Sequence, residues 1–305
     1  MFVHSVRVSM SAQPSATTLG DSKANLGLGN NKEVLPDPEL GMAQHARPSF
    51  WRHLNSDVDP ARSTGPLAAF CFMTGFIDAI SFTAIFVWCG FQTGNFAQLA
   101  LALARLWEPA ASGSGRDTSF HIADKQALTS LISFNLGAFF GRVGDRIGPH
   151  RRIWLVLATL MQALLTMGAA LAIWKSGEGS IAAFRGDPSW TNVRTFVGLA
   201  LMSASLGVQG IVGKRLNTQF TTTIVLTTVW VELVTDPRLF KLRERVKTRD
   251  HKLIAALALF TGAFTARAIL AQVGAPITLG VGAGLRLLIA ISWIVIPGKD
   301  KVVAP

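Results

Sequence analysis

The chain has 305 residues, of which half are hydrophobic and only 15% are charged, and its formal net charge is +11. Soluble domains carry about 25% charged residues, so this composition excludes an ordinary soluble globular domain. The apolar residues form long blocks and the basic residues lie between them. That distribution is typical of a helical membrane protein rather than of a nucleic-acid-binding surface.

The first 66 residues are rich in Ser, Gly, Asn and Pro and show no sustained hydrophobic periodicity. This composition predicts a disordered tail. The first strongly apolar segment begins near Leu67 and is too long for a secretory signal peptide. We therefore expect the membrane region to begin there.

Eight apolar segments follow, and two of them differ from the rest because they are short or polar for a span that needs ~20 apolar residues. The second segment opens with Gln92-Thr93-Gly94-Asn95, and the sixth is rich in threonine and carries Glu232. The eight segments are residues 67–89, 91–106, 127–141, 153–174, 196–212, 218–234, 253–272 and 277–296.

The two unusual segments occupy corresponding places in a predicted internal repeat. Gly137-Ala-Phe-x-x-Arg142 in the third segment recurs as Gly262-Ala-Phe-x-x-Arg267 in the seventh, 125 positions later (262 − 137). The repeat divides the chain into a tail of residues 1–66, a first membrane repeat 67–174, a loop 175–195, a second repeat 196–297 and a short tail 298–305. Short interrupted segments at matching places are typical of the central site of a transporter.

Two basic clusters decide the predicted topology. They are Arg142, Arg146, Arg151 and Arg152, and then Arg238, Lys241, Arg243, Arg245, Lys247, Arg249 and Lys252. If the two unusual segments are re-entrant half-helices, six segments cross the membrane, and both clusters and both termini lie in the cytoplasm. Eight crossings are the alternative. With six, the halves become inverted repeats; we favour the plasma membrane, with another organelle membrane as the alternative.

Asp78 lies in the middle of the first apolar segment, and a carboxylate at that depth is a functional-site hypothesis. In one interpretation it binds and releases a proton or another cation. In the other it forms a buried ion pair with Arg286, which lies near the middle of the last segment. The sequence leaves both interpretations open.

Polar residues in the two unusual segments are candidates for ligand binding. Gln92, Thr93, Gly94 and Asn95 offer donors, acceptors and a close backbone approach to a solute, and the alternative is a polar cap that joins two helices. The second half offers Gln209, Thr222 and Thr223, although threonines in membrane helices often bond to their own helix.

The ordered set of these motifs resembles the YoaK family, a group of bacterial and fungal multi-pass membrane proteins of unknown function. The resemblance covers about residues 65 to 297. It rests on Gly75-Phe-x-Asp78-Ala-x-Ser-Phe, Gln92-Thr-Gly-Asn95, Phe134-x-x-Gly137-Ala and Gly207-x-Gln209 with the threonine-rich segment. The family's sixth segment usually has a Thr-Gly pair, which is missing here. The resemblance implies an integral membrane protein and no established substrate.

A second resemblance is local. Residues 141–152 read Gly-Arg-Val-Gly-Asp-Arg-Ile-Gly-Pro-His-Arg-Arg and are similar to the cytoplasmic loop motif of major facilitator transporters. The resemblance implies a gating network of Arg142, Asp145 and Arg146. The alternative is a generic basic hairpin between two helices.

The sequence shows no catalytic constellation, metal-ligand spacing or cofactor motif, so we expect no enzyme, metal or cofactor. The function we favour is a small-solute transporter, with a proton as the candidate coupling ion at Asp78. A non-transporting scaffold or a subunit of a membrane complex is the alternative, and a lipid-modifying enzyme ranks below both. The expected partners are the bilayer and an unknown small solute, and the oligomeric state stays open.

Overall fold

The computed structural model describes residues 50–108, 116, 118–184, 189–218, 224, 227–241 and 243–299. Within those ranges all regular structure is helical, apart from two isolated β-bridges, so the all-α prediction is confirmed there. Residues 1–49 and 300–305 of the two predicted tails lie outside the described residues. The described residues belong to one compact unit, Pro48–Pro305.

Nine α-helices and one short 3-10 helix occupy the described residues. They are α1 (Phe50–Leu54), η2 (Pro60–Arg62), α2 (Thr64–Ile85), α3 (Gln92–Arg105), α4 (Ile122–Gly141), α5 (Val143–Ile147), α6 (Arg152–Ser176), α7 (Val193–Leu216), α8 (Thr227–Val234) and α9 (Lys247–Val295). By length and apolar composition, α2, α6, α7 and α9 are each able to cross a membrane.

Helix α9 is broken in its middle. Gly274 has φ +75° and ψ 172°, which is not helical, and Pro276 follows two residues later. A proline cannot donate the backbone hydrogen bond that a continuous helix needs, and it is well tolerated at the start of a new one. We therefore describe two parts of α9, a first part of residues 247–273 and a second part of residues 275–295. The sequence predicted separate helices there.

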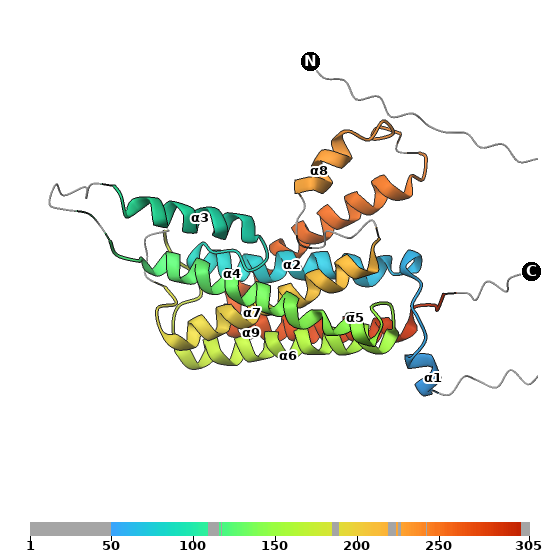
Figure 1. Ribbon diagram of the computed structural model, residues 1–305, viewed down its shortest axis with the longest axis horizontal. Helices are drawn as coiled ribbons and strands as arrows, with labels where there is room; N and C mark the ends of the chain where they lie inside the picture. The colour runs from blue at the N-terminus through green and yellow to red at the C-terminus, as the bar shows by residue number, and fades with distance from the viewer. Residues whose placement is uncertain are drawn as a thin grey trace, which may run out of the picture. The chain divides into compact units, whose positions relative to one another are not determined.

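The long helices pack side by side (Figure 1). Helix α2 packs along α9, α4 packs along α7, and α6 contacts both α7 and α9. The shorter helices are peripheral: α3 lies against α4, and α8 against α9. Each main pairing joins a helix of the first predicted half to a helix of the second.

Four glycines bring the paired helices into backbone contact. A Cβ atom at Gly75 would lie 2.0 Å from the carbonyl oxygen of Leu259, and one at Gly262 would lie 2.0 Å from that of Phe72. In the α4–α7 pair, a Cβ atom at Gly137 would lie 2.1 Å from the carbonyl oxygen of Ala204, and one at Gly207 would lie 2.1 Å from that of Phe134. Only glycine allows backbones to approach so closely, as in the small-residue interfaces of membrane helices.

One end of the helices gathers many of the basic residues, and we call it the basic end. There Thr64 lies 3.5 Å from His251, and Arg215 forms an ion pair with Asp145 at 2.7 Å. At the opposite end, two hydrogen bonds connect helices to the loop between α6 and α7. Gln126 Nε2 on α4 donates to the Trp190 carbonyl at 3.2 Å, and Ala275 N on α9 donates to Ser180 Oγ at 2.8 Å.

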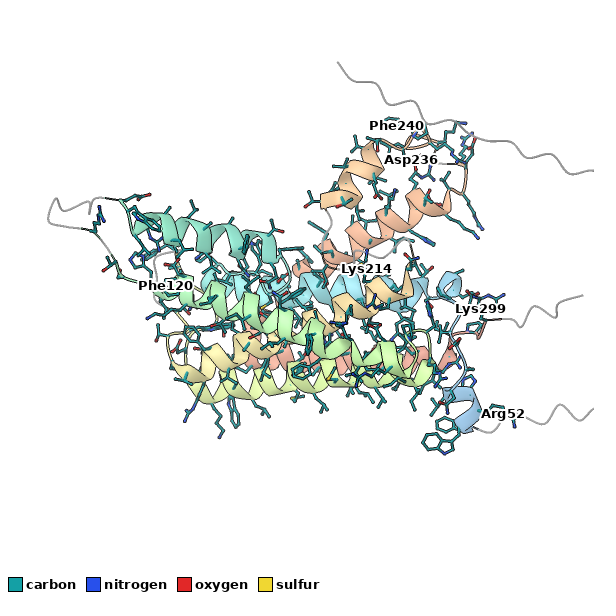
Figure 2. The ribbon with its side chains drawn as sticks, in the orientation of Figure 1. Arg52, Phe120, Lys214, Asp236, Phe240 and Lys299 are labelled. Carbon is teal, nitrogen blue, oxygen red and sulfur yellow. The ribbon has the colours of Figure 1, made fainter. Side chains whose placement is uncertain are left out.

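Six helical passes therefore run between these two ends: α2, α4, α6, α7 and the two parts of α9. Figure 2 shows Phe120, which lies just before α4, far from Arg52 and Lys299. Arg52 is in α1 and Lys299 follows α9, and both lie at the basic end.

Residues 50–63 correct the predicted tail, which was expected to extend to residue 66. They include α1 and η2, and Val58 is fully buried and donates its backbone N–H to the His150 carbonyl at 2.9 Å. His53 Nε2 bonds to the Ile294 carbonyl at 2.9 Å. This segment closes the basic end of the helices, because it contacts the beginning of α6 and the end of α9.

Arg152 holds this closure together and is fully buried, although the sequence placed it among loop charges. Its guanidinium donates to the carbonyls of Trp293, Ile296 and His53 at 3.1, 2.6 and 2.6 Å, and to Ser56 Oγ. The last carbonyls of a helix have no partner within the helix and carry partial negative charge. A planar guanidinium with five donors satisfies several of them at once.

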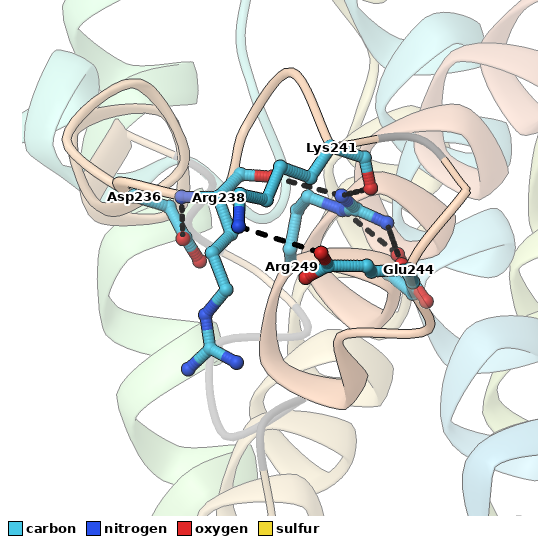
Figure 3. Close-up of polar contacts among 6 residues, drawn as sticks. Asp236, Arg238, Lys241, Glu244 and Arg249 are labelled. Atoms are coloured by element: carbon cyan, nitrogen blue, oxygen red, sulfur yellow. Dashed lines mark hydrogen bonds and ion pairs between the residues drawn. The ribbon is translucent and has the colours of Figure 1, made fainter.

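The segment between α8 and α9 is organised by a second buried arginine. Arg249 Nη1 donates to the carbonyls of Arg238 and Lys241 at 2.9 and 2.8 Å, and Nη2 donates to the Glu244 carbonyl at 2.8 Å (Figure 3). Asp250 accepts two further bonds from the same guanidinium at 2.9 and 2.7 Å. Arg249 therefore fixes the fold of the second basic cluster rather than adding to its exposed charge.

Large apolar side chains cover the outside of the helices. Leu164 on α6 is 73% exposed, and Phe264 on α9 is 69% exposed. Water would make such a surface unfavourable, whereas a bilayer core satisfies it. Further exposed apolar residues on the passes are Ile132, Leu136, Phe139, Phe140, Leu157, Leu171, Leu257, Phe260, Leu288 and Ile291.

Candidate functional site

The candidate site forms where the chain leaves α2 and turns back beside it. Phe86 ends the helix in the left-handed conformation, with φ 57°. Residues 86–91, which we call the returning loop, bring the backbone N–H groups of Cys89 and Gly90 to Asp78 Oδ1 at 2.7 and 2.8 Å. Asp78 precedes the end of α2 by seven residues, so the loop returns roughly 10 Å along the helix axis.

Polar side chains satisfy the carbonyls of the returning loop. Asn95 Nδ2 donates to the Trp88 carbonyl at 2.7 Å, and Gln92 Nε2 donates to the Cys89 carbonyl at 2.6 Å. Ser130 Oγ on α4 also donates to the Trp88 carbonyl at 2.8 Å. Buried loop backbone needs such partners in a membrane.

The same cluster reaches the second half of the chain. Ser130 Oγ lies 2.9 Å from Ser203 Oγ on α7, and it also accepts bonds from Gln92 Nε2 and Asn95 Nδ2, each at 3.1 Å. No local sequence pattern marks Ser130 or Ser203, since single serines are common in membrane helices. Their role depends on the packing of α4 against α7.

The second oxygen of Asp78 is free. Asp78 is 1% exposed, and Oδ2 accepts no hydrogen bond from any described residue. A Cβ atom at Gly90 would lie 2.8 Å from this oxygen, so only glycine fits against the carboxylate here. A buried carboxylate oxygen without a partner is costly unless a proton or a ligand completes it.

Ile224 brings the second unusual segment to the same place. Its Cγ2 atom lies 3.4 Å from the Cβ position at Gly90, and its Cδ1 atom lies 2.6 Å from that at Gly210 on α7. Ile224 is 6% exposed and precedes α8. Ile224, from the second unusual segment, therefore lies against the returning loop beside Asp78.

The other predicted ligand-binding residues are distributed unevenly. Thr93 and Gly94 are exposed at the start of α3, whereas Gln92 and Asn95 face the returning loop. Gln209 on α7 contacts α2 about one helical turn before Asp78. Its Nε2 donates to Thr74 Oγ1 at 2.8 Å and to the Phe70 carbonyl at 2.9 Å. Thr222 and Thr223 lie outside the described residues.

The predicted ion pair between Asp78 and Arg286 is wrong. Asp78 uses Oδ1 for the returning loop, whereas Arg286 donates to Gln162 Oε1 on α6 and to Ser205 Oγ on α7, the latter at 3.3 Å. Depth in the membrane suggested the pairing, but Asp78 points toward the returning loop and Arg286 points toward α6 and α7. Each charged group is buried without an opposite charge in contact with it among the described residues.

The predicted gating residues lie at the basic end and contact different partners. Asp145 in α5 pairs with Arg215 on α7, and Arg142 lies over the ring of Phe139, with 5.8 Å from its Cζ to the centroid. Arg146 is exposed. The structure therefore brings Asp145 to α7 and does not bring the three residues into one network; their role in gating stays a prediction.

The ionisable groups of the described residues form no metal site elsewhere. No cluster of three His, Cys, Asp or Glu side chains suited to a metal ion occurs among the described residues. Cys71 and Cys89 are both buried and free. The chemistry available at Asp78 is therefore that of a carboxylate beside neutral amides and hydroxyls.

The helical fold, the four long apolar helices and the apolar exterior define an integral membrane protein. Residues 67–292 match the model of a family described as protein of unknown function (DUF1275), and the chain belongs to that family. No curated protein and no solved structure matches the chain.

Proposed function

We propose that this protein is a small-solute transporter with its site between the two halves of the chain. The observation that carries the proposal is the meeting of the returning loop and Ile224 beside the free oxygen of Asp78. In secondary transporters, interrupted segments of two halves converge on a site near the middle of the membrane.

The proposed topology has six crossings, with α3 and the segment of α8 as half-helices and both termini in the cytoplasm. The six passes between two ends support it. So does the charge of the basic end, since basic loops favour the cytoplasmic side. Each half then contributes three passes, and the second half has the opposite orientation.

The glycine contacts support an inverted repeat. Gly75 and Gly207 differ by 132 positions (207 − 75), and so do Phe72 and Ala204, the residues that face their partner glycines. The partner helices differ by 125 positions, both between Gly137 and Gly262 (262 − 137) and between their facing residues Phe134 and Leu259 (259 − 134). Two interfaces that use equivalent residues are what a duplicated fold requires.

Asp78 is the proposed proton-binding residue. Oδ1 keeps the returning loop in place, while Oδ2 is free to take a proton without breaking those two bonds. A carboxylate that changes its charge in this position would alter the field at the adjoining solute site. This division of labour allows coupling without unfolding of the loop.

Uptake into proteoliposomes tests the proposal. The purified chain is reconstituted and assayed with a panel of labelled small solutes, with and without an inward proton gradient. Wild type should accumulate at least one solute in response to the gradient, and Asp78→Asn should abolish that response. Asp57→Asn, which changes an exposed carboxylate at the basic end, is the matched control and should leave uptake unchanged.

The outcomes separate the alternatives. Gradient-driven uptake that persists in Asp78→Asn would remove the carboxylate from coupling. No uptake of any solute by folded wild-type protein would favour the non-transporting scaffold or complex subunit.

Cysteine labelling tests the topology. A membrane-impermeant maleimide should label Arg116→Cys and Gly179→Cys from outside intact cells, and should label Arg243→Cys only after the membrane is opened. Labelling of Arg116→Cys only from the cytoplasm would contradict the six-crossing arrangement.

A further inference from the structure

A second buried charge lies apart from the returning loop. Arg286, in the second part of α9, is 0% exposed and contacts α6 through Gln162 and α7 through Ser205. No described Asp or Glu forms an ion pair with it. An arginine remains charged even when it is buried, so this position has a permanent positive charge that the surrounding side chains do not neutralise.

Two donors at this position have no acceptor among the described residues. They are Arg286 Nε and Gln162 Nε2, both fully buried. Nε lies on the same edge of the guanidinium as Nη2, whose one contact is the 3.3 Å bond to Ser205 Oγ. That edge is the one that arginine uses for two parallel hydrogen bonds to an anion.

The Ser205 hydroxyl does not supply the missing acceptor. It accepts from Nη2 at 3.3 Å and donates its own proton to the Met202 carbonyl at 2.7 Å, and it makes no bond to Nε. A neutral hydroxyl also leaves the charge of Arg286 uncompensated. What the position lacks is both an acceptor and a negative charge, and a water molecule would provide only the first.

The position has a special place in the proposed repeat. Gln162 and Arg286 differ by 124 positions (286 − 162), close to the 125-position offset that relates the second pass of each half. They are therefore near-equivalent residues that contact each other where α6 and α9 cross. A ligand bound there would contact both halves.

We propose that Arg286 and Gln162 form a binding site for a small monovalent anion. The shared chemistry is a compact singly charged acceptor, which is either a free halide or the carboxylate of a small organic acid. Arg286 supplies the charge and the Nε–Nη2 edge, and Gln162 supplies a neutral donor. The site goes beyond the proposed transport function, and its test requires no transport.

Thermal unfolding of the full chain in detergent tests the proposal. The potassium salts of chloride, bromide, nitrate, formate, acetate and lactate are compared with bulky gluconate at constant ionic strength and pH. A ligand that binds only the folded state raises the unfolding temperature, here by roughly 5 °C at about one hundred times its dissociation constant. A rise with chloride and bromide identifies a free halide, and a rise with the carboxylates alone identifies an organic acid.

Gln162→Glu is the decisive variant because it keeps the side-chain volume and places a carboxylate on the atom that already contacts Arg286. The variant should be at least as stable as wild type in gluconate and should lose the response to every anion. Arg286→Gln should lose the response as well, if it folds. Arg215→Gln, which removes an exposed arginine from the basic end, is the control and should keep it.

Two results would overturn the proposal. One is a wild-type unfolding temperature that is the same in gluconate and in all six test anions. The other is a Gln162→Glu variant that responds to the anions as wild type does, since a surface effect would then explain the rise. Either result leaves the uptake assay at Asp78 unaffected, so failure of this site and failure of the transport proposal are distinguishable.

Discussion

The carboxylate of Asp78 accepts the backbone N–H of Gly90 at 2.8 Å, twelve positions along the chain. A side chain within α2 thus fixes the point to which the returning loop comes back. The same contact brings Gly90 against the second carboxylate oxygen, where a Cβ atom would intrude at 2.8 Å. One residue therefore has a structural oxygen and a free oxygen, and substitutions can separate the two roles.

Asp78→Leu should destabilise the protein much more than Asp78→Asn. Leucine strands the two buried N–H groups of Cys89 and Gly90, at about 1–3 kcal/mol each, whereas asparagine keeps an acceptor oxygen for them. Thermal unfolding followed by tryptophan fluorescence would measure the difference, since the chain has eight tryptophans. Equal unfolding temperatures for the two variants would show that the loop does not depend on Asp78.

The glycine contacts predict a matched pair of severe substitutions. Gly75→Ala and Gly207→Ala each place a methyl group about 2 Å from a facing carbonyl oxygen, and such overpacking should cost about 1–3 kcal/mol or more. Size-exclusion chromatography and thermal unfolding in detergent would detect the loss.

Gly284→Ala is the control for these substitutions, because a methyl group at Gly284 meets nothing within 4 Å. It should be neutral or slightly stabilising, since alanine favours helix. If Gly75→Ala were as stable as Gly284→Ala, the close approach of α2 to α9 would be refuted.

Arg152→Ala should release the segment that closes the basic end. The substitution removes donors from the carbonyls of Trp293, Ile296 and His53, and hydrogen bonds to a charged group contribute about 1.5–3 kcal/mol each. Limited proteolysis should then cut within residues 50–63. Arg151→Ala, at the exposed neighbouring position, should leave the cutting pattern as in wild type.

Arg249→Ala should loosen residues 238–244 while leaving the membrane helices intact. Three backbone carbonyls lose their donor at once. Hydrogen exchange should speed up in this segment and remain slow in α2 and α7. Arg243→Ala removes an exposed charge from the same segment and should leave the exchange rates as they are. An unchanged exchange pattern in Arg249→Ala would show that the segment is held by other contacts.

The positions of the helices follow closely from apolar blocks. The second segment was predicted at 91–106, and α3 occupies Gln92–Arg105, because a polar tetrad interrupts the apolar run there. The first segment was predicted to extend to Cys89, but α2 ends at Ile85. Residues 86–89 are apolar because they are buried, and hydropathy reports burial rather than backbone conformation.

The site was predicted only in part. Asp78, Gln92 and Asn95 were named as candidates because polar groups in an apolar run require partners, and the structure brings them together at the returning loop. Arg286 was given the wrong partner, since depth along a helix can be read from sequence but the direction in which a side chain points cannot. The role of Arg152 was missed for a related reason: an arginine beside a predicted helix end looks the same whether it faces water or the carbonyls of another helix.

The reciprocal glycine contacts have a consequence for biosynthesis. The backbone of α2 at Phe72 packs against Gly262, which is synthesised 190 residues later (262 − 72). At about 5–20 residues per second, that delay is on the order of 10 to 40 seconds. During this time the face of α2 that carries Phe72 and Gly75 is exposed to lipid and to other nascent helices. Its partner is synthesised only after α4, α6 and α7, so the α2–α9 pair forms later than these helices enter the membrane.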